Sequence, residues 1–168
     1  ATLADGRAVA VKVLRPGVER RVADGLDSMR LGAALVWRFV PAARRLEPQA
    51  FVETIARSLD LELDMRLEAA AASEMAEVMA KDGYMSAPPV VWDGVGKRVL
   101  TLEWAPGVPM TDPALRDLPG LDVDLLADNV VRAFLVQALD HGAFHADLHE
   151  GNLFASAPAH LTAIDFGI

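Results

Sequence analysis

Alternating apolar and polar positions near the start of the chain predict a β-strand over residues 8–14. Val9, Val11 and Val13 would share one face, which leaves Lys12 on the other face among small and apolar residues. The Asp-Gly pair at residues 5–6 separates this run from a shorter apolar run and predicts a hairpin turn. A lysine at such a position is either a solubility device of an edge strand or a positioned charge. The second interpretation is favoured because lysine is uncommon in strands.

Apolar residues at helical spacing dominate the next part of the chain. They predict a helix over residues 18–45 that is broken or kinked at Pro41. A second helix is predicted from Pro48 to about residue 81, with apolar residues every four positions. Gly83 lies where this helix would end.

The remainder of the chain alternates between short strands and helices. The predicted elements are a hairpin of residues 90–92 and 98–103, a short helix over 112–117, an amphipathic helix over 121–141, and strands near 153 and over 161–164. This order predicts an α+β fold with a cleft between a sheet-rich half and a helix-rich half.

Composition excludes several classes of function. The net charge of −8 argues against non-specific nucleic-acid binding through a basic face. The absence of cysteine excludes disulfides, thiolate catalysis and cysteine-ligated metal. We expect neither a signal peptide nor a membrane span, because the longest uncharged runs fall short of the roughly 20 residues that a span requires. The two ends look like cuts, which predicts a piece of a longer protein.

The residues with the clearest chemistry cluster near the end of the sequence. Asp147 could accept or orient the proton of a nucleophile, and Asn152 and Asp165 offer oxygen ligands that suit Mg²⁺ or Mn²⁺. Each could instead shape a turn, but their occurrence together favours phosphoryl transfer. His145 and His149 are four apart in the same loop, and without a third ligand they are better interpreted as structural than as a zinc site.

Three acidic residues lie in the second predicted helix. Glu62 would pair with Arg66 one turn later, whereas Asp64 and Glu68 have the same spacing and like charge. Lys12 is the expected partner of Glu68, and that ion pair would position the lysine on nucleotide phosphates.

Short motifs along almost the whole chain resemble one family. They are Val-Ala-Val-Lys-Val at 9–13 with Arg-Pro-Gly at 15–17, Glu-Leu-Asp at 62–64 with Glu-Ala-Ala at 68–70, His-Ala-Asp at 145–147, Gly-Asn at 151–152 and Asp-Phe-Gly at 165–167. In this order they resemble the ABC1/UbiB/ADCK group of atypical protein-kinase-like proteins.

The resemblance implies a role for each matched residue. Lys12 would contact nucleotide phosphates, Glu68 would hold Lys12, and Asp147 would be the catalytic-loop aspartate. Asn152 and Asp165 would bind the metal. The remaining implied sites are a hinge that meets adenine, formed by Glu103, Trp104 and Ala105, and a regulatory acidic motif formed by Glu62 and Asp64.

The resemblance also implies a two-lobed protein-kinase-like fold, truncated at both ends. Residues 1–104 would form the N-lobe-like region, and residues 105–168 would begin a helical C-lobe. The expected function is that of a UbiB-like ATPase or kinase that binds ATP with Mg²⁺ or Mn²⁺ and supports isoprenoid-quinone or lipid metabolism. Its location would be the cytoplasm or the cytoplasmic side of a membrane, reached through regions outside this sequence, and a quinone-precursor lipid is an expected partner.

Two alternatives stay open. A small-molecule phosphotransferase of the aminoglycoside-kinase type has a similar loop, and Leu148 and Glu150 stand where the ABC1/UbiB/ADCK group usually has proline. Arg-Pro-Gly at 15–17 and the pair Glu62 and Asp64 favour the UbiB-like interpretation. The third hypothesis is a nucleotide-gated scaffold without catalytic activity.

Overall fold

The first predicted strand is present and belongs to a two-stranded sheet. The computed structural model describes residues 1–136, 139 and 148–166. β1 (Val9–Val13) pairs antiparallel with β3 (Val99–Glu103), and the register sets Lys12 opposite Leu100. The predicted hairpin at residues 5–6 is formed but is reduced to a single bridge between Thr2 and Ala8. Long-range pairing with β3 therefore fixes the orientation of Lys12.

Only part of the second predicted hairpin is present. Val90 makes an isolated bridge to Leu102, and the Val91 amide donates to the Thr101 carbonyl at 2.9 Å. The residues that follow form a short 3-10 helix, η2 (Trp92–Gly94), instead of a regular strand.

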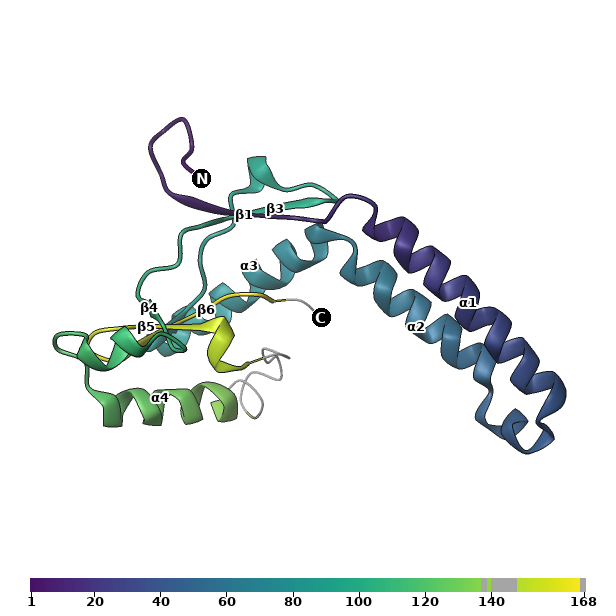
Figure 1. Ribbon diagram of the computed structural model, residues 1–168. Coiled ribbons are helices and arrows are strands. Elements are labelled where there is room, and N and C mark those ends of the chain that lie inside the picture. Colours follow the sequence, from purple (N-terminus) through teal and green to yellow (C-terminus); the bar gives the residue numbers. More distant parts are fainter. Residues whose placement is uncertain (137–138, 140–147, 167–168) are drawn as a thin grey trace.

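Two helices after β1 form an antiparallel pair, called here the helical hairpin (residues 18–62). α1 (Val18–Phe39) ends before Pro41, as predicted, and a 3-10 turn, η1 (Pro41–Leu46), leads into α2 (Pro48–Glu62). Figure 1 shows this pair projecting away from both sheets, with η1 at the far end. The two helices contact each other through the buried residues Leu26, Ala33, Val52 and Ala56, with the partly buried Val22, Ile55 and Leu59 packed against them.

The prediction of one helix over residues 48–81 is wrong. The chain breaks between α2 and α3 (Met65–Asp82), where Asp64 has an extended backbone and its carboxylate accepts the Arg66 amide at 3.1 Å. An aspartate N-cap satisfies an amide that has no partner within the helix. The predicted helical pair of Glu62 and Arg66 is therefore wrong as well, since Arg66 forms an ion pair with Asp64 at 2.6 Å. The predicted stop is correct, because Gly83 caps α3 at φ 76°.

A second sheet has the order β2-β6-β5-β4. The predicted strands are present as β5 (Leu153–Ser156) and β6 (His160–Ala163), and they pair antiparallel. β2 (Met85–Ser86) joins β6 in parallel, and β4 (Val108–Pro109) covers the other edge. These two strands were not predicted, because each contains only two residues.

Helices pack against this second sheet and bury the main core. The short helix predicted over residues 112–117 is η3 (Pro113–Asp117), and the amphipathic helix is α4 (Val123–Val136) within the described residues. The core includes Met75, Met79, Leu126, Leu153 and Leu161.

α3 connects the two sheets. Its first turns bury Met65 and Ala69 against Leu100 of β3, and its later turns pack into the core beside β2. Figure 1 shows the helix lying between the β1–β3 pair and the second sheet. None of the helices within the described ranges is long and apolar enough to cross a membrane.

Candidate active site

Three predicted site residues from distant parts of the chain meet in one ion-pair cluster. Lys12 Nζ lies 2.8 Å and 3.0 Å from the two carboxylate oxygens of Glu68, and 2.7 Å from Asp165 Oδ1. Lys12 comes from β1, Glu68 from the first turn of α3, and Asp165 follows β6. The tertiary contact predicted between Lys12 and Glu68 is confirmed, and Asp165 completes the cluster.

The three residues differ in exposure. The Glu68 side chain is 8% exposed, whereas Lys12 and Asp165 are each 46% exposed. Burial raises the pKa of Glu68, and the hydrogen bonds and charge of Lys12 only partly offset this effect. Burial acts to lower the pKa of Lys12, but hydrogen bonds to Asp165 and Glu68 outweigh it and raise that pKa. Lys12 is therefore held as a cation at the open side of the cluster.

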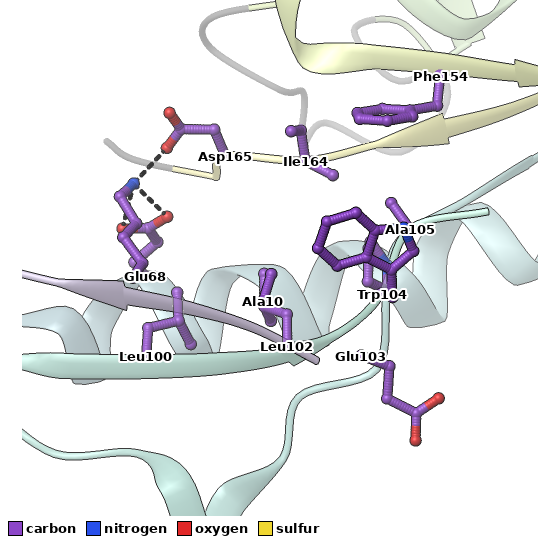
Figure 2. Close-up of a pocket in the computed structure, with 12 residues that line it drawn as sticks. Ala10, Glu68, Leu100, Leu102, Glu103, Trp104, Ala105, Phe154, Ile164 and Asp165 are labelled. Carbon is purple, nitrogen blue, oxygen red and sulfur yellow. Dashed lines mark hydrogen bonds and ion pairs between the residues drawn. The ribbon is translucent and has the colours of Figure 1, made fainter. Parts of the chain in front are cut away.

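An apolar cavity of about 300 Å³ extends from this cluster. Ala10 and Leu102 form one wall from the β1–β3 sheet, and they face Phe154 of β5 and Ile164, which follows β6. Figure 2 shows Glu68 and Asp165 at one end, with Trp104 and Phe154 near the other. An apolar slot with one ammonium and two carboxylates at one end suits a ligand that has an aromatic part and an anionic part accompanied by a divalent cation.

Sequence reasoning missed half of the residues that line the cavity. Ala10 shares a strand face with Lys12, so the period of the strand could have identified it. No local signal identifies Phe154, because its role depends on which face of β5 lies against the first sheet. The other unpredicted lining residues are Pro88, Leu100, Leu102 and Ile164.

The predicted hinge lines the cavity where β3 ends. The Trp104 amide donates to the Ala8 carbonyl at 3.0 Å, and the Glu103 amide donates to the Pro89 carbonyl at 2.9 Å. The Glu103 carboxylate is turned away from the cavity in Figure 2 and accepts a hydrogen bond from Arg7 at 2.6 Å. The backbone of this segment is therefore held against Ala8 and Pro89, and Trp104 and Ala105 line the cavity.

The two predicted metal ligands, Asn152 and Asp165, lie on segments of the chain that are joined by a backbone hydrogen bond. The Ile164 amide donates to the Asn152 carbonyl at 2.9 Å, which sets Asn152 beside the residue that precedes Asp165. Asp165 has a left-handed backbone at φ 62°, a conformation that aspartate and asparagine tolerate better than most residues. One carboxylate and one amide oxygen fit a hard cation such as Mg²⁺. Within residues 1–136, 139 and 148–166, no group of three or more acidic, histidine or cysteine side chains is arranged to hold a metal ion.

Two of the residues singled out in the sequence lie outside the described residues. They are Asp147, which is predicted to be catalytic, and His145. His149 is described, and its Nδ1 accepts the Gly151 amide at 3.0 Å. That bond supports the structural interpretation of His149 over the zinc interpretation.

The predicted regulatory motif lies apart from the cavity. Glu62 ends α2 and Asp64 caps α3, and neither residue lines the cavity. Hydrogen bonds from Arg66 lower the pKa of Asp64 to about 2. The described structure gives Asp64 a capping role, and its regulatory role stays a prediction.

The whole sequence, residues 1–168, matches the ABC1 atypical kinase-like domain. The chain belongs to this family. The ABC1 domain is 38% identical over its whole length to a probable protein kinase UbiB of Xylella fastidiosa and 37% identical to one of Marinobacter nauticus. It is equally similar, at 38%, to the uncharacterized protein slr1919 of Synechocystis. The chain spans 32%, 31% and 30% of the lengths of these three relatives.

A solved structure shares the fold. The ABC1 domain superimposes on a structure titled as the complex of Rv3197 and erythromycin from Mycobacterium tuberculosis, with a TM-score of 0.77 and 28% identity. The match covers 99% of this chain and 41% of the other. The predicted α+β, protein-kinase-like fold is therefore confirmed, and the domain boundary at residue 104 stays a prediction.

Proposed function

We propose that the ABC1 domain binds Mg-ATP in the cavity beside Lys12, as part of a UbiB-like atypical kinase or ATPase that supports isoprenoid-quinone or lipid metabolism. The observation that carries the proposal is the cluster of Lys12, Glu68 and Asp165 at one end of an apolar slot. A nucleotide has the matching division into an apolar base and an anionic phosphate chain. The family and its UbiB relatives support the same assignment.

Each residue in the slot has a physical role in this proposal. Lys12 neutralises phosphate charge, and the buried Glu68 carboxylate keeps the ammonium at the mouth of the slot. Ala10 has a side chain small enough to let a flat base approach the β1–β3 sheet. Phe154 and Ile164 exclude water from the opposite side.

Asn152 and Asp165 would hold the divalent cation through their side-chain oxygens. When bound, such a cation supplies neutralisation of the charge that develops on the transferred phosphoryl group. Asp147 would accept or orient the proton of the nucleophile.

The decisive test is Asp165→Asn in the full protein that carries this domain. Asparagine tolerates the left-handed backbone at φ 62°, so the variant should fold while it loses one anionic oxygen. We expect loss of Mg²⁺-dependent ATP binding in isothermal titration and loss of ATP turnover. Asp117→Asn, an exposed aspartate in η3, is the matched control and should behave as wild type. Unchanged ATP binding in Asp165→Asn would overturn the proposal.

The aminoglycoside-kinase hypothesis has one observation in its favour, the Asp-Leu-His order of residues 147–149. A panel of aminoglycosides assayed beside ATP hydrolysis, with and without quinone-precursor mimics, separates the two functions. Stimulation by the mimics supports the UbiB-like function, whereas phosphorylation of a drug supports the alternative. Tight nucleotide binding without turnover of any kind supports the scaffold hypothesis.

A further inference from the structure

The far end of the helical hairpin exposes large apolar side chains. Here the hairpin tip is defined as residues 31–46, the end of α1 and the η1 turn. Leu31, Trp37, Phe39 and Leu46 are 64%, 47%, 69% and 71% exposed, and Leu35 is 49% exposed. Leu31, Leu35 and Phe39 follow one another at four-residue spacing, so they form a continuous stripe along α1. Soluble proteins expose such contiguous apolar patches mainly at interaction sites.

The packing of the hairpin explains why these residues stay exposed. α1 and α2 meet through Leu26, Ala33, Val52 and Ala56, a strip in which two of the four side chains are alanines. Each helix of an isolated pair can bury only the stripe that faces its partner. Figure 1 shows the tip at the end of the hairpin farthest from the sheets, so the rest of the domain does not cover it.

The charge of the tip is opposite to that of the whole chain. Residues 31–46 contain Arg38, Arg44 and Arg45 and no acidic residue, whereas the chain carries a net charge of −8. All three arginines are exposed. A surface that attracts this segment is therefore anionic, and the same surface repels the acidic remainder of the domain.

Two of the arginines of the hairpin tip lie against its aromatic rings. The Arg44 guanidinium lies 4.9 Å from the centre of the Trp37 ring, and that of Arg38 lies 5.7 Å from the centre of the Phe39 ring. Arg44 also donates to the Trp37 carbonyl at 2.8 Å. Aromatic rings at headgroup depth with arginines on phosphate oxygens are characteristic of proteins at a membrane interface.

We propose that the hairpin tip docks on a lipid bilayer that contains anionic phospholipids. Trp37 and Phe39 insert among the headgroups, and the three arginines contact lipid phosphates. A second copy of the domain fits the tip less well, because symmetric pairing of two tips would set arginines against arginines. This inference concerns a surface away from the nucleotide cavity, so it stands or falls independently of the proposed function.

The test measures co-sedimentation of the full protein with vesicles. One vesicle preparation is phosphatidylcholine alone, and the other is an equimolar mixture of phosphatidylcholine and phosphatidylglycerol. We expect binding to the anionic vesicles to exceed binding to the neutral vesicles and to fall as salt is added. Equal binding to both preparations would overturn the proposal.

A charge reversal and its control separate the tip from general electrostatics. Arg38→Glu with Arg45→Glu removes two lipid contacts, which should weaken anionic vesicle binding by roughly 30-fold or more. Arg20→Glu with Arg21→Glu makes the same change in net charge at the base of α1, also on exposed residues. The base variant should lose much less affinity. Equal losses in the two variants would show that the tip has no special role.

An aromatic variant tests insertion. Trp37→Ser with Phe39→Ser should reduce anionic vesicle binding by at least ~10-fold. Trp92→Ser, at a 56% exposed tryptophan in η2, should have no effect. Wild-type vesicle binding by the tip variants would overturn the proposal. It would also be overturned if those variants changed only the oligomeric state or only the stability, because another protein surface would then cover the tip.

Discussion

The sheet region and the helical hairpin use apolar residues in opposite ways. In the sheet region, Val9, Met79, Leu100 and Leu161 are almost fully buried. In the hairpin, large residues such as Phe39 and Phe51 remain more than 60% exposed, although the sequence there is also rich in apolar residues. The number of packed layers accounts for the difference. α3 lies between two sheets, whereas α1 and α2 pack mainly against each other.

The largest effect is expected from truncation of a core leucine. Leu161→Ala in β6 leaves a cavity among fully packed neighbours and should lower the free energy of unfolding by about 2–5 kcal/mol. Leu31→Ala in the hairpin is the matched control and should change it by no more than about 0.5 kcal/mol. Urea unfolding followed by circular dichroism measures both. A comparable loss of stability in Leu31→Ala would contradict this comparison, because it would mean that the tip is buried in the protein.

Substitutions at two glycines should have intermediate effects on stability that are opposite in sign. Gly107 has φ 95°, and an added Cβ would lie 2.5 Å from the Ala155 carbonyl oxygen, so Gly107→Ala should destabilise the fold by about 1–3 kcal/mol. Gly32 lies in α1 with open space around it, so Gly32→Ala should stabilise the hairpin by about 0.5–1 kcal/mol. Thermal unfolding of both variants checks the signs. Destabilisation by Gly32→Ala would contradict the open environment of that face.

The smallest effect on stability is expected at Asp64, where the helical hairpin joins α3. Arg66 lowers the pKa of Asp64 from 3.8 to about 2. The stabilisation that this pKa shift contributes to the folded state is present above pH 3.8 and is lost as the pH falls through about 2. Asn is also a good N-cap, so Asp64→Asn removes the charge but keeps the cap. The difference in urea midpoint between wild type and variant should be largest near neutral pH and vanish in acid. A difference that is independent of pH would contradict the assignment.

Local chemistry made much of the fold predictable. The alternation of apolar and polar residues predicted β1 and the face on which Lys12 lies. Pro41 predicted the end of α1, and Gly83 predicted the end of α3. The strand pattern identified Lys12, side-chain chemistry identified Asp165, and the resemblance supported both together with Glu68. The structure brings the three residues within hydrogen-bond distance.

The errors arose where two local signals competed or where pairing was distant. Leu59, Leu63 and Leu67 continue the helical spacing through a break that the Asp64 cap creates. The parallel pairing of β2 with β6 joins Met85 to Leu161, and a two-residue strand has no periodicity to reveal it. The facing apolar walls of the cavity depend on such pairings, so the charged end and the hinge at Trp104 were predictable, whereas Ala10, Phe154 and Ile164 were not.

The contact between Lys12 and Asp165 has a consequence for folding order. The two residues are 153 positions apart, so nearly the whole domain must be synthesised before this contact can form. Closing so long a loop costs entropy that only the intervening helices and sheets can offset. The contact between Lys12 and Asp165 is therefore expected to form late, after the sheets. A chain emerging from the ribosome would acquire the cluster only once residue 165 is free to fold back onto β1.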